Sequence, residues 1–206
     1  MPPHGVEYNG YNARPWVIID YKRDVNISRI PGAQYIGFND PLPTGPGIYV
    51  LQPRPDEDSE MEAWLWRVWE RGKIGLYVDE GYILPKSGKT PAFTSILTQG
   101  RSKGIPVIIL SQRPVWLNRF AISESDFYQV FNLNDEMDRK TIGRFIPDGV
   151  EDRLEPYHSV WYDVGRDVRR ELGPVPNEKA ILKTFGHRLA PLHVPEEPEP
   201  PKIKVI

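Results

Sequence analysis

Two adjacent carboxylates, Asp79 and Glu80, follow the apolar stretch 74–78 and have the types and spacing for metal-dependent hydrolysis. The stretch predicts a buried strand, which would place the pair at its carboxyl end. There Asp79 can hold Mg²⁺ while Glu80 polarises an attacking water. The same pair is also common as an ordinary acidic strand end, so its meaning depends on the surrounding elements.

Gln112 occupies a matching position, because it follows the apolar run 105–110. Ligands of open α/β sheets bind at the carboxyl ends of the strands, where an amide can orient a water or contact a terminal phosphate. Arg101 lies between the two runs, at the end of a predicted helix. It either satisfies the last carbonyls of that helix or serves a site elsewhere.

Gly88, Lys89 and Thr90 match the last three residues of a phosphate-binding loop, but the rest of that motif is missing. The loop G-x-x-x-x-G-K-[ST] needs another glycine five positions before Gly88, where the chain has Ile83, and Gly81 is two positions too early. Lys89 near a helix start can still meet an anion. A solvated loop before a capped helix is the interpretation that we favour.

The order of the apolar patterns predicts an α/β fold with a mainly parallel sheet in residues 1–150. Strand-like and helix-like segments alternate, with strands at 16–19, 47–51, 74–78, 105–110 and 125–133 and helices at 56–73, 90–102 and 134–146. Residues 151–189 contain an alternating segment, 159–172, that predicts an antiparallel hairpin. Residues 190–206 are rich in proline and glutamate and predict an extended tail.

Composition excludes several classes of protein. The 206 residues contain no cysteine, which excludes a thiolate metal site and a disulfide framework. The net charge of -2 argues against a uniformly basic protein that coats nucleic acid. No apolar run approaches the roughly 20 residues of a membrane span, and we expect a cytoplasmic protein. The segment 86–123 nevertheless carries six Lys or Arg and no acid.

Aromatic residues allow two interpretations each. Trp64, Trp66 and Trp69 lie on one predicted helix, where packing on a sheet is favoured over stacking with nucleic acid. Trp116 follows Gln112 closely and could line a pore or an interface between subunits, and the sequence leaves both open.

Three motifs together resemble one known family. LYVDEGY at 76–82, LTQGRSKGIPVIILSQRP at 97–114 and FNLNDEMDRKTI at 131–142 resemble, in order and spacing, the P-loop ATPases of the FtsK and HerA superfamily. The closest likeness is to bacteriophage DNA-packaging and virion-assembly members, over residues 16–147. The resemblance implies a RecA-like core that forms a ring, usually hexameric, hydrolyses ATP with Mg²⁺ and moves double-stranded DNA through its pore.

The resemblance also assigns roles to individual residues. Asp79 matches the Walker B aspartate that holds Mg²⁺ through water, and Glu80 matches the catalytic base. Gln112 matches the polar sensor on the neighbouring strand and, with the two acids, would contact bound ATP. Arg101 matches the arginine of the QGR motif and is our candidate for a residue that acts across a subunit boundary.

One departure from the family is large. Its members have a central strand, the phosphate-binding loop and a helix directly before the strand that ends in D-x-K. Asp20 and Lys22 match that D-x-K end. No Gly-Lys-Ser/Thr precedes the matching strand in this sequence. Without the central strand, 105–110 would leave ladder groups unpaired, at roughly 1 to 3 kcal/mol for each buried group. We therefore expect the carboxyl-terminal part of a longer ATPase, with little or no activity alone.

Two functions remain open at this point. The first is an ATP-driven DNA translocase of a phage, acting in the host cytoplasm with capsid or portal proteins as candidate partners. The second is a catalytically silent subunit for DNA binding or assembly, whose basic segment 86–123 contacts phosphate backbones without hydrolysis.

Overall fold

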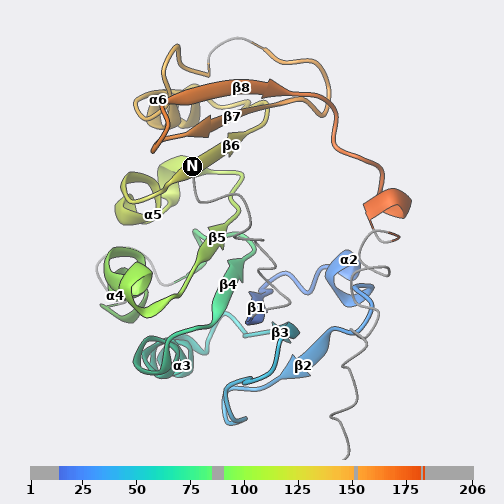
Figure 1. Cartoon of the computed structure of the whole chain (residues 1–206), viewed down its shortest axis with the longest axis vertical. Coiled ribbons are helices and arrows are strands. Elements are labelled where there is room, and N and C mark those ends of the chain that lie inside the picture. Colours follow the sequence, from blue (N-terminus) through green and yellow to red (C-terminus); the bar gives the residue numbers. More distant parts are fainter. Residues whose placement is uncertain (1–13, 85–90, 151–152, 182, 184–206) are drawn as a thin grey trace, which may run out of the picture.

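The computed structural model describes residues 14–84, 91–150, 153–181 and 183. In that part of the chain, a parallel sheet and an antiparallel sheet follow one another along a shared layer of helices (Figure 1). The predicted loop Gly88-Lys89-Thr90 and the predicted tail 190–206 lie outside the described residues. No helix in the described part is long and apolar enough to cross a bilayer.

The first sheet is parallel throughout, as the sequence predicts. Its order is β2-β3-β1-β4-β5, and its strands are β1 (Pro15–Ile19), β2 (Gln34–Ile36), β3 (Gly47–Leu51), β4 (Gly75–Val78) and β5 (Val107–Ile109). The register pairs Ile19 of β1 with Val78 of β4, and Val78 with Ile109 of β5. The carboxyl ends of these three strands therefore stand level with one another.

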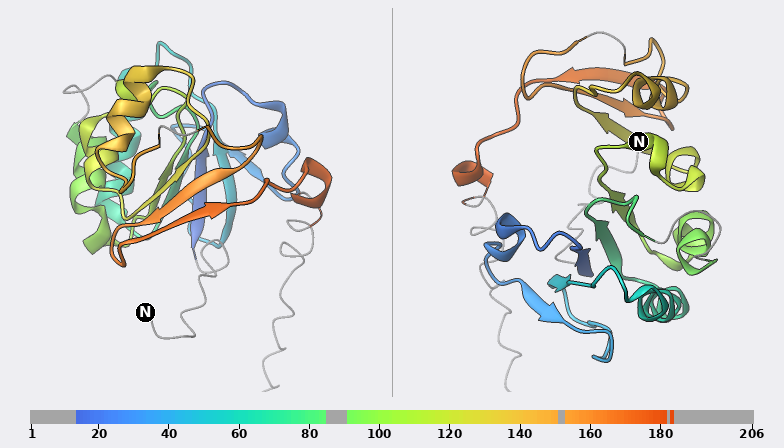
Figure 2. Two further views of the ribbon diagram at one scale, coloured as in Figure 1. Left: turned by 90° about the horizontal axis from the view of Figure 1, so that it is seen from above. Right: turned by 180° about the vertical axis from the view of Figure 1, so that it is seen from behind.

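Helices cover the two faces of the sheets unequally. The helices are α2 (Val25–Ser28), α3 (Asp58–Arg71), α4 (Pro91–Gln99), α5 (Arg119–Ser123) and α6 (Glu136–Gly143), with 3-10 turns η1 (Gly100–Lys103) and η2 (Pro114–Trp116). Figure 2 shows α3, α4, α5 and α6 on one side of both sheets and α2 on the other. On the second face, Ile27 and Ile30 around α2 pack with Ile18 of β1 and Ile48 and Val50 of β3.

Helix α3 anchors the main core because its apolar residues recur at helical spacing. Met61, Trp64, Leu65 and Val68 are all buried against the sheet. The predicted core packing of Trp64 is confirmed, while Trp66 and Trp69 of the same helix pack at the margin of that core.

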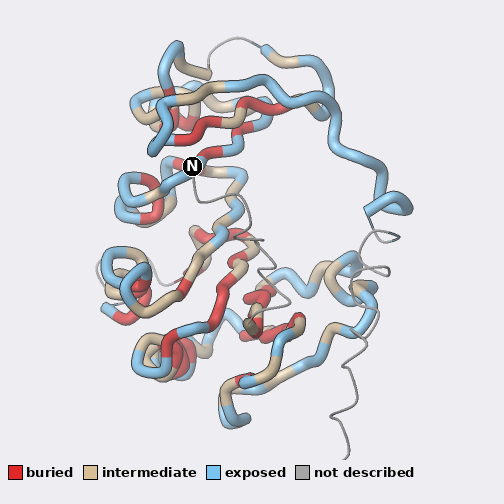
Figure 3. Tube along the Cα trace, in the orientation of Figure 1, coloured by how far each residue is buried: buried red, intermediate tan, exposed pale blue. Residues whose placement is uncertain are grey.

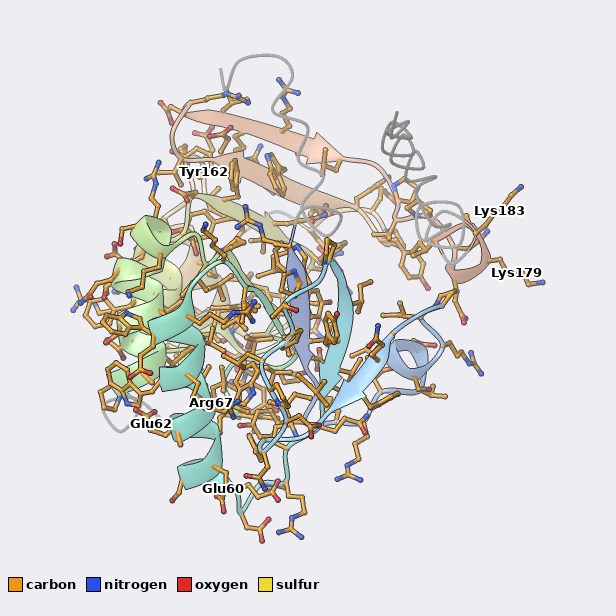
Figure 4. The ribbon with its side chains drawn as sticks, turned by 60° about the horizontal axis from the view of Figure 1, so that its bottom comes forward. Glu60, Glu62, Arg67, Tyr162, Lys179 and Lys183 are labelled. Atoms are coloured by element: carbon orange, nitrogen blue, oxygen red, sulfur yellow. The ribbon has the colours of Figure 1, made fainter. Side chains whose placement is uncertain are left out.

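Two arginines of α3 form hydrogen bonds with the loop that connects β2 and β3. Arg67, labelled in Figure 4, donates to the carbonyl oxygens of Phe38 at 2.6 Å and Asp40 at 2.7 Å. Arg71 donates to the carbonyl oxygen of Pro43 in the same connection. These bonds satisfy loop carbonyls that no strand partner reaches.

The second sheet is antiparallel, with the order β6-β7-β8. It consists of β6 (Phe127–Val130), β7 (Ser159–Asp163) and β8 (Val168–Leu172), so the predicted hairpin is confirmed as β7 and β8. Strand β6, which the sequence pattern placed among the parallel strands, pairs with β7 instead. Its Tyr128 and Val130 pack with Ile142 of α6 in a core of their own.

The two sheets lie edge to edge, and the neighbouring edges, β5 and β6, are not paired with each other. Among the described residues, β5 pairs only with β4 and β6 pairs only with β7. Ile108 and Leu110 at the first edge and Phe127 at the second are exposed, although they are large and apolar. Figure 3 shows exposed positions on both β5 and β6. This arrangement agrees with the expectation that strand 105–110 carries an unpaired ladder.

Replacing Gly75 by alanine should destabilise the fold, because Gly75 of β4 lies directly against the indole of Trp16 on β1. An added Cβ would overlap the ring atoms Cδ2, Cε2 and Cε3. We expect the Gly75→Ala variant to lose about 1 to 3 kcal/mol of unfolding free energy in urea titrations. Gly45→Ala, whose Cβ would meet only the Tyr49 hydroxyl at 3.9 Å, is the control. Equal stability of the two variants would contradict this packing.

Candidate active site at the carboxyl edge of the parallel sheet

The carboxyl ends of β1, β4 and β5 are tied together by backbone hydrogen bonds that continue beyond the strands. Asp79 N donates to Ile19 O at 3.1 Å, and Leu110 N donates to Val78 O at 2.9 Å. Gly81 N, in the turn after β4, donates in turn to Leu110 O, just after β5, at 2.8 Å. Residues that follow these three strands are therefore held at one edge, as the sequence pattern predicts.

Glu80 is the most constrained residue of this edge. It is 3% exposed, and its φ of 53° lies in the left-handed region, which a glutamate seldom adopts. Its Oε1 accepts from Lys22 Nζ, whereas its buried Oε2 has no hydrogen-bond partner in the described part of the chain. A buried carboxylate oxygen left without a donor is costly, and it is a ready acceptor for a water or a ligand proton.

Gly81 makes the turn after Glu80 possible. A Cβ at this position would overlap Cγ2 of Ile109 and lie 3.2 Å from Cδ2 of Leu117. The missing side chain lets the turn pack directly on the end of β5. Gly81 therefore has a packing role here, which its place in an incomplete phosphate-loop pattern does not reveal.

Asp79 is half-buried, and burial raises the pKa of its carboxyl group. Lys22 acts in the opposite direction, while the negative charge of Glu80 adds to the rise. The hydrogen bond to Glu80 raises the pKa of Lys22, which therefore stays protonated. Two acids share a single ammonium group here, so a cation would stabilise the ionised form of Asp79.

Asp20 supports the loop that carries Lys22 and does not face the acidic pair as a free group. It is fully buried, and its Oδ1 accepts from Asp24 N at 3.1 Å. Its Oδ2 accepts from Gln52 Nε2 at 2.9 Å. Both oxygens of Asp20 therefore accept hydrogen bonds that stabilise the turn. Lys22, the last residue of the D-x-K motif, instead forms the ion pair with Glu80.

Gln112 lies exposed after β5, next to the turn of Gly81. The structure thus brings Asp79, Glu80 and Gln112 to the same edge. The neighbour of the amide, Arg113, donates from Nε to the buried Asp138 at 2.8 Å, and Asp138 also accepts from Val115 N at 2.9 Å. Sequence reasoning missed this support, although a second acid in the first turn of α6 was its signal.

Arg101 does not join the other candidates within one chain. It lies on η1, which precedes β5, and so stands at the amino edge of the sheet, opposite the carboxyl edge. Its side chain is 93% exposed, and the one ion pair that it forms with a described residue is with Asp126, at 4.0 Å. If Arg101 serves a site of this type, the site belongs to another copy.

The described residues fit a magnesium ion held jointly with phosphates. They contain no group of three or more His, Cys, Asp or Glu that could hold a metal alone. Mg²⁺ in phosphoryl-transfer sites commonly takes one or two carboxylates and keeps phosphate and water as its other ligands. Asp79 offers one such carboxylate.

Solved structures share this fold. Those of the genome packaging NTPase B204 from Sulfolobus turreted icosahedral virus 2, in complexes with sulfate, AMPPCP and ATP-gammaS, superpose with TM-scores of 0.62, 0.61 and 0.61. Each is 20% identical, over 79–80% of this chain and 83–84% of B204. The chain therefore has the α/β fold of a viral genome packaging NTPase.

Sequence comparison then gives the family. No protein-family model matches the chain. The DNA packaging ATPase P9 of Enterobacteria phage PRD1 is 45% identical over 186 residues, which are 85% of this chain and 81% of P9. The chain belongs to the family of this phage DNA packaging ATPase, and the predicted likeness to phage packaging proteins is confirmed.

Removing the charge of Asp79 should stabilise the fold near neutral pH. The folded-state pKa of Asp79 is raised, so its ionisation opposes folding above the ordinary value of 3.8. We expect Asp79→Asn to have a higher unfolding free energy than the parent at pH 7 in EDTA. The gain should shrink as the pH falls through the raised pKa and vanish below the unfolded value.

Denaturant titrations from pH 7 to about pH 3, below the unfolded pKa, measure this dependence. Asp126→Asn, at a largely exposed carboxylate 4.0 Å from Arg101, is the control and should show no such gain. A destabilised Asp79→Asn at pH 7 would contradict the inferred electrostatics.

Proposed function

We propose that this protein hydrolyses ATP to drive packaging of double-stranded DNA into a phage capsid. The observation that carries the proposal is the buried carboxylate of Glu80, beside Asp79 and Gln112: its Oε1 accepts from Lys22 and its Oε2 has no partner among the described residues. The printed name of its relative, DNA packaging ATPase P9, supports the same chemistry. The structures of B204 with AMPPCP and ATP-gammaS show that a protein of this fold binds ATP analogues.

Each residue of the edge has a part in the proposed reaction. Asp79 would hold Mg²⁺ through water, and the ion would supply positive charge to the phosphates. Glu80 Oε2 accepts the proton of the attacking water, while Lys22 fixes the other oxygen. Gln112 orients that water or the terminal phosphate from the adjacent strand.

The phosphate clamp comes, in this proposal, from a strand, loop and helix that the 206-residue sequence does not contain, since G-x-x-x-x-G-K-[ST] is absent from it. The support is the pair of edges on β5 and β6, which have no further strand partner within residues 14–84, 91–150 and 153–181. A strand between them would complete both ladders, and its helix would cover Ile108, Leu110 and Phe127. Hydrolysis would then require the protein expressed from its complete gene.

The position of Arg101 supports a proposal for how copies of the protein assemble. We place the protein in the FtsK and HerA superfamily and propose a closed ring, with six copies as the expected number, in the host cytoplasm. Arg101 of one copy would reach the acidic edge of the next, and capsid or portal proteins would be further partners. The exposure of Arg101, away from its own site, supports this assignment.

A catalytically silent DNA-binding or assembly subunit is the second candidate. The absence of a phosphate-binding motif from this sequence favours it. That subunit would bind DNA with a steep salt dependence and no response to ATP.

Replacing Glu80 by glutamine should abolish most ATP turnover, because glutamine keeps the shape of the side chain and cannot accept a proton. In the protein expressed from its complete gene, we expect kcat to fall about 10²- to 10⁴-fold in a phosphate-release assay. Glu60→Gln, at an exposed glutamate on α3 (Figure 4), is the matched control. Unchanged turnover in Glu80→Gln would refute hydrolysis at this site.

Replacing Arg101 by alanine should lower turnover on the order of 10³-fold, as loss of an arginine finger does. Co-assembly of Arg101→Ala with Glu80→Gln tests action across the boundary, since some interfaces then combine an intact Glu80 with an intact Arg101. Phosphate release by the mixture should exceed that of either variant alone. Lys179→Ala, an exposed cation in Figure 4, should turn over normally. A mixture as inactive as its components would show that Arg101 does not act in trans.

A further inference from the structure

An exposed apolar surface lies directly beside the candidate active site. Val115, Trp116 and Phe120 are all exposed, Trp116 by 57%, and we call these three residues the Trp116 patch. The patch begins three residues after Gln112, on η2 and the first turn of α5. Exposed aromatic residues gathered in this way on a folded chain indicate an interaction site.

The patch is held rigidly. Tyr82 meets Trp116 edge-on, with ring centroids 5.5 Å apart, and the Arg113 guanidinium lies 4.3 Å from the centroid of the indole. Arg113 is in turn fixed by its ion pair with the buried Asp138 at 2.8 Å. Such a surface loses little side-chain entropy on binding, which favours affinity.

The chemistry of the patch fits a protein partner better than DNA. Trp, Tyr and Arg are the residues enriched in the energetic centres of protein interfaces. Duplex DNA keeps the faces of its bases stacked and offers none to Trp116. The cation in contact with the indole, Arg113, is already paired with Asp135 and Asp138, which leaves it little charge to offer a polyanion.

The opposite edge of the same sheet has the complementary charge. Arg14, Lys73, Arg101 and Lys103 lie at or beside the amino ends of β1, β4 and β5. In the described part of the chain, no carboxylate forms an ion pair with Arg14, Lys73 or Lys103. Arg14 donates to Gly104 O at 2.8 Å, and Lys103 lies 3.9 Å from the centroid of Trp69. This amino edge is basic, whereas the carboxyl edge carries more acids than bases among the described residues, since Lys22 and Arg113 lie there with Asp79, Glu80, Asp135 and Asp138.

We propose that the Trp116 patch binds the amino edge of a second copy of this chain, around η1. Unlike surfaces meet in such a contact, so it is head-to-tail, and each copy keeps one free edge for a further neighbour. The inference rests on the proposed function in one respect, because the contact would carry Arg101 of the second copy toward Asp79 and Glu80. The patch then supplies the apolar centre of the interface and the charged edges set its direction.

Truncation of Trp116 tests the patch directly. In the protein expressed from its complete gene, sedimentation velocity without ATP or DNA should show self-association of Trp116→Ala weakened about 30-fold or more, the loss typical of a hot-spot residue. Tyr35→Ala, at a residue 54% exposed on the distant edge strand β2, should associate like the parent. Thermal unfolding of both variants at low protein concentration checks that the fold is intact.

A mixing experiment tests the head-to-tail direction. Trp116→Glu keeps an intact amino edge and Arg101→Glu keeps an intact patch, so each variant alone should be largely monomeric. Their equimolar mixture should form dimers and nothing larger, because only one productive contact is available. Parent-like association of Trp116→Glu, or a mixture without dimers, would overturn the proposal.

The association assays use no nucleotide, so they separate this inference from the proposed hydrolysis. Loss of assembly in Trp116→Ala together with parent-like turnover in Glu80→Gln would leave the interface supported and the hydrolysis at Glu80 refuted. Parent-like assembly of Trp116→Ala together with lost turnover in Glu80→Gln would leave the hydrolysis supported and this interface overturned.

Discussion

The ion pair between Lys22 and Glu80 is the interaction on which the carboxyl edge depends. It joins the loop after β1 to the turn after β4, and it compensates a buried carboxylate that would otherwise be costly. The left-handed backbone of Glu80 and the missing side chain at Gly81 let that turn lie against β5. One oxygen of Glu80 is thereby held while the other stays available, as the proposed general base requires.

A shared layer of helices packs on both sheets and fixes their positions relative to each other. Helices α3 and α4 pack on the parallel sheet, while α5 and α6 pack on the antiparallel one, so the edges of β5 and β6 are held near each other without pairing. A strand that joined them would make one continuous sheet, and a helix following that strand would cover the exposed Ile108 and Phe127. In our proposal the completed sheet brings the phosphate clamp to Asp79, Glu80 and Gln112, and the neighbouring copy brings Arg101.

Sequence patterns predicted the parallel sheet, the β7–β8 hairpin and the convergence of Asp79, Glu80 and Gln112, because strand polarity alone determines which ends meet. They did not predict that β6 would leave the parallel sheet, since pairing is decided by which edges are available. The Lys22–Glu80 contact and the Arg113–Asp138 support were also missed, because they join residues distant in sequence. The packing role of Gly81 is invisible without the position of Ile109.

The most direct measurement is a structure of the protein, expressed from its complete gene, with Mg²⁺ and a non-hydrolysable ATP analogue. The account predicts a terminal phosphate within hydrogen-bond reach of Gln112, with Asp79 bridged to the ion through water. Glu80 Oε2 should face the water in line with that phosphate, and an added strand should pair with both β5 and β6. A nucleotide bound away from the carboxyl edge, or edges of β5 and β6 that remain unpaired, would contradict it.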